Sequence, residues 1–255
     1  MPDVPVLDLL GSGTRVLFRR ELKAYFLSPI AYVFGALFLA VLLWQASAAT
    51  IVDGAPASMQ PFFAYLPWLF LLFLPGLTMR LWAEERKLGT IELLLTFPVE
   101  ARQVVMGKFL AVMVFLGCMM ALTLGLPLTL GAYGRLDWPA TLGSYLATLL
   151  YASSYVAVGM FWSSMTRDQI IALLASIVSL ALLFLLGVPQ IVEGMFAGSP
   201  AWLQDLLNGL SPYKYFQSIA RGVFDTRDFV YFACFCGFFL YANTLVLHVR
   251  RQQKG

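Results

Sequence analysis

The sequence has little charge. Asp, Glu, Lys and Arg make up 12% of the 255 residues, about half of the roughly 25% found in an ordinary soluble domain. The apolar set AVILMFWYC makes up 60%, so too few polar residues remain to cover a water-exposed globule of this size. A disordered chain is excluded as well, because such chains are poor in apolar residues. The composition indicates an integral membrane protein.

Histidine and cysteine are also scarce. His248 is the only histidine, and Cys118, Cys234 and Cys236 lie in apolar runs. One histidine cannot form a cluster for a metal or a catalytic base, and these cysteines imply no disulfide framework. Residues two apart point to different faces of a helix, so Cys234 and Cys236 do not form a redox C-x-x-C pair. We therefore predict no metal site and no catalytic residue.

The sequence lacks the phosphate-binding loop G-x-x-x-x-G-K-[ST]. The glycines of Gly11-Ser12-Gly13-Thr14 are too closely spaced, and no lysine follows them. The chain is therefore not expected to bind ATP through such a loop. We predict no cofactor in this chain, and its net charge of +3 is too small to suggest a nucleic-acid partner.

Long apolar runs are abundant. A helix needs about 20 mainly apolar residues to cross a bilayer core of about 30 Å. Six such runs contain no Asp, Glu, Lys or Arg, which disfavours an ion-coupled carrier, and they are too uniformly apolar for barrel strands. We predict an all-α integral membrane protein with one transmembrane domain over residues 1–255. Its six spans lie at about 30–51, 62–79, 109–130, 141–165, 170–187 and 229–247.

Lys and Arg are distributed unevenly between the two sides of this arrangement. The side richer in these residues faces the cytoplasm. Thirteen of the 17 fall on the side that holds both termini, which predicts cytoplasmic termini. They are Arg15, Arg19, Arg20, Lys23, Arg80, Arg86, Lys87, Arg102, Lys108, Arg167, Arg250, Arg251 and Lys254.

The first span has a competing interpretation. Ala46-Ser47-Ala48 is similar to a signal-peptidase site. A leader ending there would exceed the usual length of about 15–30 residues. We therefore expect an uncleaved first span.

The segment before the first span is expected to form an amphipathic helix at the membrane surface. Thr14 is predicted to cap it, and Ser28-Pro29 to end it, since the residue before a proline avoids the α conformation. The basic residues of this interfacial helix are Arg15, Arg19, Arg20 and Lys23.

The longest predicted outer connection covers residues 188–228 and is rich in aromatic residues. Aromatic residues favour the membrane interface, so this connection predicts two short helices on or in the outer leaflet. A solvent-exposed loop with a small packed core is the alternative.

The fourth predicted span is rich in small residues, which allow helices to approach closely. Such residues would allow close packing either within the subunit or at a dimer interface. They are Ala152, Ser153, Ser154, Ala157 and Gly159.

The most charged stretch, residues 84–103, lies between the second and third spans. The second span is expected to continue to Leu88 and end at Gly89, a residue typical of helix C′ positions. Thr90 then caps a short helix at about 91–97, with Glu92 in its first turn. This helix exposes apolar Leu93-Leu94-Leu95, which either lies back on the bundle or docks into a partner's groove.

Two strings, AEERKLGTIELLLTFPV (83–99) and GKFLA (107–111), resemble the coupling segment of ABC-2-type transporter permeases. They are most similar to the branch of gliding-motility and nitrous-oxide-reductase-maturation permease subunits. RRELKAYFLSPIAYV (19–33) and LSPYKYFQSIARGVFDTRDFVYF (210–232) resemble that branch's N-terminal helix and last outer loop.

The resemblance implies a type V-like half-transporter in the bacterial inner membrane. Two six-helix subunits, identical or related, would pair in the lipid, and each would contact a separate cytoplasmic ABC subunit that binds ATP and Mg. The positions that would couple to the ATPase subunit are Glu84, Glu85, Arg86, Gly89, Thr90, Glu92, Leu93 and Leu94.

Three functions remain open. The chain is a permease that moves or exports a substrate, or a non-transporting component that passes ATPase motion to an extracytoplasmic accessory protein. The third is an uncoupled pore. The resemblance transfers no substrate-binding residue.

Overall fold

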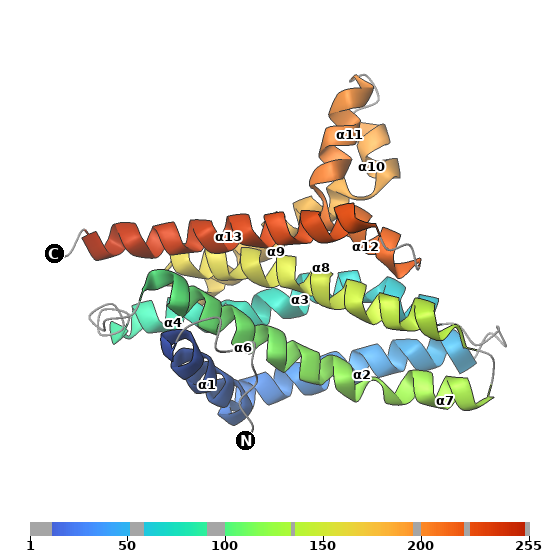
Figure 1. The fold of residues 1–255 in the computed structure, drawn as a ribbon, viewed down its shortest axis with the longest axis horizontal. Helices are drawn as coiled ribbons and strands as arrows, with labels where there is room; N and C mark the ends of the chain where they lie inside the picture. Colours follow the sequence, from blue (N-terminus) through green and yellow to red (C-terminus); the bar gives the residue numbers. More distant parts are fainter. Residues whose placement is uncertain are drawn as a thin grey trace.

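The computed structural model describes residues 12–51, 59–90, 100–133, 136–195, 200–221 and 225–252, and their regular secondary structure is helical. The long helices run side by side along one axis of the molecule (Figure 1). The helices are α1 (Ser12–Leu27), α2 (Pro29–Ile51), α3 (Gln60–Thr78), α4 (Arg80–Lys87), α6 (Ala101–Leu122), α7 (Gly125–Tyr133), α8 (Trp138–Met165), α9 (Gln169–Leu186), α10 (Pro189–Met195), α11 (Ala201–Leu210), α12 (Pro212–Ala220) and α13 (Thr226–Gln252).

Five helical segments of the described chain are long and apolar enough to cross a membrane. They are Gln60–Lys87, Ala101–Ala132, Trp138–Met165, Gln169–Leu186 and Thr226–Val249. Parts of α1 and α2 meet the criterion only together, bent by 69°, so the count is five or up to six. The structure thus supports a multi-pass helical membrane protein, while six spans remain a prediction.

Helix α1 lies across the first turns of α6 (Figure 1). Its predicted end is confirmed, because Ser28 is not helical and Pro29 begins α2. The predicted cap at Thr14 is wrong, since α1 begins at Ser12 and Thr14 is buried. Gly107 of α6 accounts for the burial of Thr14, because a Cβ built there would lie only 3.3 Å from the Thr14 carbonyl oxygen. This close packing encloses the first turn of α1.

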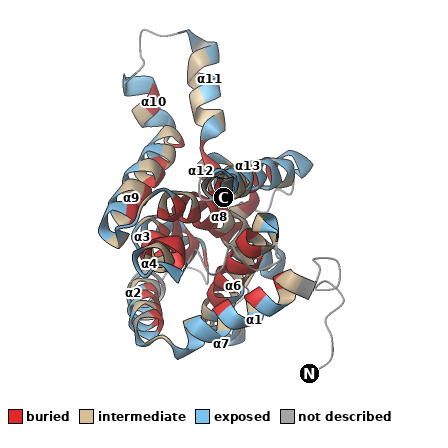
Figure 2. Cartoon of the chain, turned by 90° about the vertical axis from the view of Figure 1, so that its left-hand side faces the viewer, coloured by how far each residue is buried: buried red, intermediate tan, exposed pale blue. Residues whose placement is uncertain are grey.

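Helix α8 lies at the centre of the bundle, packed against α3, α6, α9, α12 and α13 (Figure 2). The small residues predicted for the fourth span make these close contacts possible. Ala152, Ser154 and Ala157 have no exposed surface, and Gly159 lies directly against Thr78 of α3. The structure therefore places these four positions in packing within the subunit.

The described residues of the connection at 188–228 form three short helices, α10, α11 and α12, where two were predicted. Ser211 caps α12, its hydroxyl accepting a hydrogen bond from the Tyr213 backbone N–H at 3.2 Å, and this cap packs against Gly187 at the end of α9. Phe216 and Ile219 bury α12 against the bundle. Helices α10 and α11 instead stand out from the side of the bundle, across its long axis (Figure 1). One part of the connection is therefore packed, and another part projects.

Candidate functional site

The helix that continues the second predicted span breaks at Met79, between α3 and α4. Ser163 of α8 fills the break. Its hydroxyl accepts hydrogen bonds from the backbone N–H groups of Trp82 (3.1 Å) and Ala83 (3.2 Å) and donates one to the Met79 carbonyl oxygen (2.8 Å). A side chain inserted into a helical hydrogen-bond ladder is a known cause of kinks. The start of α4 is thereby fixed to α8.

The end of α4 is held by a cation and closed by a glycine. The Arg86 guanidinium donates to the carbonyl oxygens of Ser164 and Thr166, both at 2.8 Å. These carbonyls belong to the C-terminal end of α8, where acceptors are left without helical partners and a positive charge is favoured. Gly89 follows α4 with φ of +72°, a left-handed conformation suited to glycine. The predicted end at Gly89 is confirmed.

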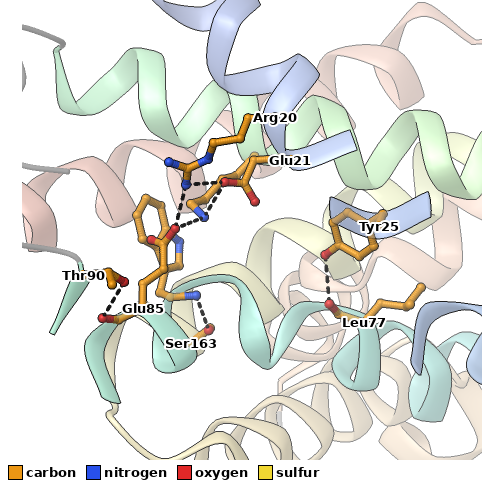
Figure 3. Close-up of polar contacts among 9 residues, drawn as sticks. Arg20, Glu21, Tyr25, Leu77, Glu85, Thr90 and Ser163 are labelled. Carbon is orange, nitrogen blue, oxygen red and sulfur yellow. Dashed lines mark hydrogen bonds and ion pairs between the residues drawn. The ribbon is translucent and has the colours of Figure 1, made fainter. Parts of the chain in front are cut away.

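The other face of α4 meets α1 and α6 through charged side chains (Figure 3). Glu85 Oε1 accepts hydrogen bonds from Lys108 Nζ of α6 at 2.9 Å and from Arg20 of α1 at 3.1 Å. Glu21 Oε1 of α1 lies 3.2 Å from the same Lys108 nitrogen and 2.9 Å from Arg20. Two cations and two carboxylates therefore join three helices.

Lys108 is the centre of this cluster. Its side chain is only 2% exposed, and its ammonium lies 4.9 Å from the centroid of the Trp82 ring, where a cation is attracted by the ring face. A buried cation is tolerated only when it is paired and hydrogen-bonded. The positions of Glu21 and Glu85 meet that requirement.

Tyr25 makes a further contact between α1 and α3. Its hydroxyl donates to the Leu77 carbonyl oxygen at 3.0 Å (Figure 3). Burial, and to a smaller extent the Glu21 carboxylate, raise the pKa of Tyr25 far above its ordinary value. The phenol therefore keeps its proton and remains a donor. We use the name "junction" for α1, α4, the first turns of α6 and the end of α8, as joined by these contacts.

The structure brings some of the predicted coupling residues together. Glu85 and Arg20 are in contact, and the Thr90 hydroxyl donates to the Glu85 carbonyl oxygen at 3.3 Å. Arg86 points to α8 and Glu84 lines a cavity beside α1. The predicted helix at 91–97, with Glu92, Leu93 and Leu94, lies outside the described residues.

The basic residues of the interfacial helix are not equivalent. Arg20 joins the junction, whereas Arg19 and Lys23 are exposed and Arg15 is half-buried. The sequence therefore places the helix correctly but does not identify which cation contacts α4.

Three residues of the junction were not predicted from the sequence. The charge distribution places Lys108 only in a positive flank, although its position among Val104, Val105 and Val112 puts a cation on an apolar helix face. Glu21 similarly lies four residues from both Leu17 and Tyr25. An ionised group on a buried face requires a partner, so the sequence indicates an ion pair at both positions. For Ser163, no feature of the sequence indicates its hydrogen bonds to the start of α4.

Residues 77–249 match the family model described as ABC-2 family transporter protein. The matched range runs from the end of α3 into α13 and contains α4, α6 and α8, while α1 lies outside it. No curated protein matches the chain.

Proposed function

The chain belongs to the ABC-2 family of transporter proteins, and from this premise we propose that it is a permease subunit driven by a separate cytoplasmic ATP-binding subunit. The family's membrane component lacks an ATP site of its own. The ATPase subunit, with its ATP and Mg, would then supply the energy for movement of a substrate.

The observation that carries the proposal is the pairing of Glu85 with Lys108 and Arg20. Helix α4 is short, and its end at Lys87–Thr90 is exposed. Through the junction, a displacement of this end would act on α1 and α6 by ion pairs and on α8 by Ser163 and Arg86. We propose that the ATPase subunit docks on α4 and the following segment, residues 91–99.

We further propose six spans, both termini in the cytoplasm of a bacterial cell, and pairing with a second permease subunit. One side of α9 exposes Ile170, Leu174, Val178 and Leu182, a surface that lipid or a second subunit would cover. Close relation to the gliding-motility and nitrous-oxide-reductase-maturation branch also belongs to this proposal, and rests on the strings at 83–99 and 210–232.

A second candidate function is favoured by the projecting α10 and α11 pair. Met195, Trp202, Leu206 and Leu210 are exposed there. Exposed apolar side chains of this kind suit contact with lipid or a protein. In this interpretation the chain passes ATPase motion to an extracytoplasmic partner and transports nothing.

The test is purification of the chain, tagged at its C-terminus, from its native membrane in gentle detergent. We expect an ABC ATPase to co-purify and the eluate to hydrolyse ATP. A stable extracytoplasmic partner without stimulation of the ATPase by any cargo would favour the second function. A lone chain without ATPase activity would contradict both and leave an uncoupled pore.

Two variants locate the coupling. Gly89→Pro cannot adopt the required positive φ, because proline fixes φ near −65°. Glu92→Lys places a cation at a predicted helix N-terminus, where it is disfavoured. We expect both proteins to insert but to lose the link between ATP use and function. Gly117→Ala is the control, since nothing lies within 4 Å of a Cβ built there.

A further inference from the structure

A cavity of about 400 Å³ lies beside the junction. Residues of α1, the start of α2, α3 and α4 line it, together with Lys108 of α6. Its volume lies within the range of about 300–1,000 Å³ typical of small-molecule sites. The lining is divided by chemistry. Six charged side chains come from α1, α4 and α6, whereas Ala31, Phe34, Gly76 and Leu77 come from α2 and α3. A ligand that fits must combine a charged part with an apolar part.

Most of the charges in the lining neutralise each other. Arg20, Glu21 and Lys108 are joined in the junction, together with one oxygen of Glu85. A cation and an anion remain outside this network. In the described part of the chain, neither the Arg80 guanidinium nor the Glu84 carboxylate forms a hydrogen bond or ion pair.

Two further atoms beside the cavity, Arg80 Nε and Glu85 Oε2, are buried without a hydrogen-bond partner in the described residues. Neither has accessible surface, so a ligand in the cavity does not reach them. The cavity therefore presents one donor group, the terminal nitrogens of Arg80, and one acceptor group, the Glu84 carboxylate.

The position of the cavity favours an amphiphile from the bilayer. It lies at the bend where α1 ends, at Ser28, and α2 begins. The apolar lining belongs to α2 and α3, which form part of the apolar segments suited to a membrane. The charged lining belongs to the polar end of the bundle. A lipid placed here would have its headgroup beside α4 and its chains beside α2 and α3.

We infer that this cavity binds a zwitterionic phospholipid with a primary ammonium headgroup, of the phosphatidylethanolamine class. Its phosphate pairs with Arg80, and its ammonium donates to Glu84. An anionic lipid without an ammonium group would leave the Glu84 carboxylate unpaired. A quaternary ammonium has no N–H to donate. The inference goes beyond the proposed function and does not depend on it.

Native mass spectrometry of the delipidated full chain in detergent tests this inference. The probes are phosphatidylethanolamine, phosphatidylcholine and phosphatidylglycerol with identical acyl chains. Because a hydrogen bond to a charged group contributes about 1.5–3 kcal/mol, we expect phosphatidylethanolamine to bind about tenfold or more tightly than the other two. Equal binding of the three lipids would overturn the inference without any variant being needed.

Two replacements of similar size test the assigned groups. Arg80→Gln and Glu84→Gln should each weaken phosphatidylethanolamine binding about tenfold, since each removes one charge-assisted contact. Arg102→Gln is the control, because Arg102 is exposed and does not line the cavity. Unchanged binding in both cavity variants would overturn the assignment.

A soluble headgroup distinguishes a lipid from a free phosphodiester. Glycerophosphoethanolamine carries the same charges without acyl chains. If the apolar lining contributes to lipid binding, glycerophosphoethanolamine should not displace phosphatidylethanolamine at an equal concentration. Displacement at that concentration would contradict a lipid ligand and assign the cavity to a soluble aminophosphate.

Discussion

Helix α8 holds its neighbours in two different ways within about one turn. At Gly159 it packs against Thr78 of α3, so closely that a Cβ on the glycine would lie 2.1 Å from the Thr78 hydroxyl oxygen. Four residues later, Ser163 holds α4 by three hydrogen bonds. We use the name "seam" for the contact of Gly159 with Thr78. The seam depends on shape, whereas the junction depends on polar partners.

The seam is therefore a contact that resists change, whereas the junction is a set of contacts that can exchange partners. Close-packed interfaces transmit displacement because they have no free volume to absorb it. Hydrogen bonds and ion pairs can be replaced by equivalent ones, and a neutral hydrogen bond contributes only about 0.5–1.5 kcal/mol to stability. We therefore expect α3 and α8 to move together and α4 to change its contacts around them.

Removal of the buried cation should have the largest effect. Lys108→Met leaves Glu21 and Glu85 facing each other, with only the half-exposed Arg20 between them. Breaking a buried ion pair from one side costs about 3–5 kcal/mol. We expect a loss near the lower figure, because Glu85 keeps 18% of its side-chain surface exposed. The thermal midpoint of the chain in detergent, followed by size-exclusion chromatography, measures the loss.

A combined variant distinguishes lost pairing from lost packing. Glu21→Gln and Glu85→Gln, added to Lys108→Met, remove the uncompensated charges and should restore most of the stability. If the triple variant is no more stable than Lys108→Met, the role assigned to the ion pairs is wrong.

The seam should be the next most sensitive position. Gly159→Ala forces a methyl group into the space of Thr78, and overpacking of this kind costs about 1–3 kcal/mol. Gly117→Ala adds the same methyl group to open space on α6 and should be neutral or stabilise by up to about 1 kcal/mol. The same unfolding assay compares them.

A second replacement identifies the clash. Thr78→Ala removes the hydroxyl that lies closest to the added methyl group and should partly restore Gly159→Ala. An unaltered midpoint for Gly159→Ala would show that α3 and α8 are not in close contact at this point.

Ser163→Ala should have an effect on stability comparable to that of Gly159→Ala and a specific effect on α4. It leaves the backbone N–H groups of Trp82 and Ala83 without this partner, and each buried group left unsatisfied costs about 1–3 kcal/mol. Hydrogen exchange at α4 should rise while exchange along α3 is unchanged. Ser176→Ala is the control, because in the described part of the chain that hydroxyl bonds within its own helix, to the Ala172 carbonyl oxygen. Equal hydrogen exchange at α4 in Ser163→Ala and Ser176→Ala would show that Ser163 does not hold α4.

The exposed pair of Arg102 and Glu100 should matter least. Both side chains are more than half exposed, and surface ion pairs contribute about 0–1 kcal/mol. Arg102→Met should therefore leave the thermal midpoint nearly unchanged, in contrast to Lys108→Met on the same helix. A similar loss for both would remove the distinction between the buried cluster and the surface.

Local sequence rules predict those helix boundaries that depend on a single residue. Gly89 ends α4 because it alone tolerates the left-handed turn, and Pro29 separates α1 from α2. The contact between Glu85 and Lys108 joins residues 23 positions apart on two helices, and no local pattern specifies which helix faces pair. Ser163 is still harder to predict, because its partners are backbone groups at the break between α3 and α4. The close packing of Ser211, the cap of α12, against Gly187 is a tertiary contact of the same kind.

The most direct test is site-specific photo-crosslinking in native membranes. A photoreactive residue at Lys87, on the exposed end of α4, should form an adduct with an ABC ATPase, because this end is the proposed docking point. The same residue at Trp202, which is exposed on α11, should give no such adduct. An ATPase adduct at Trp202, or none at Lys87 while the ATPase co-purifies, would contradict coupling through the junction.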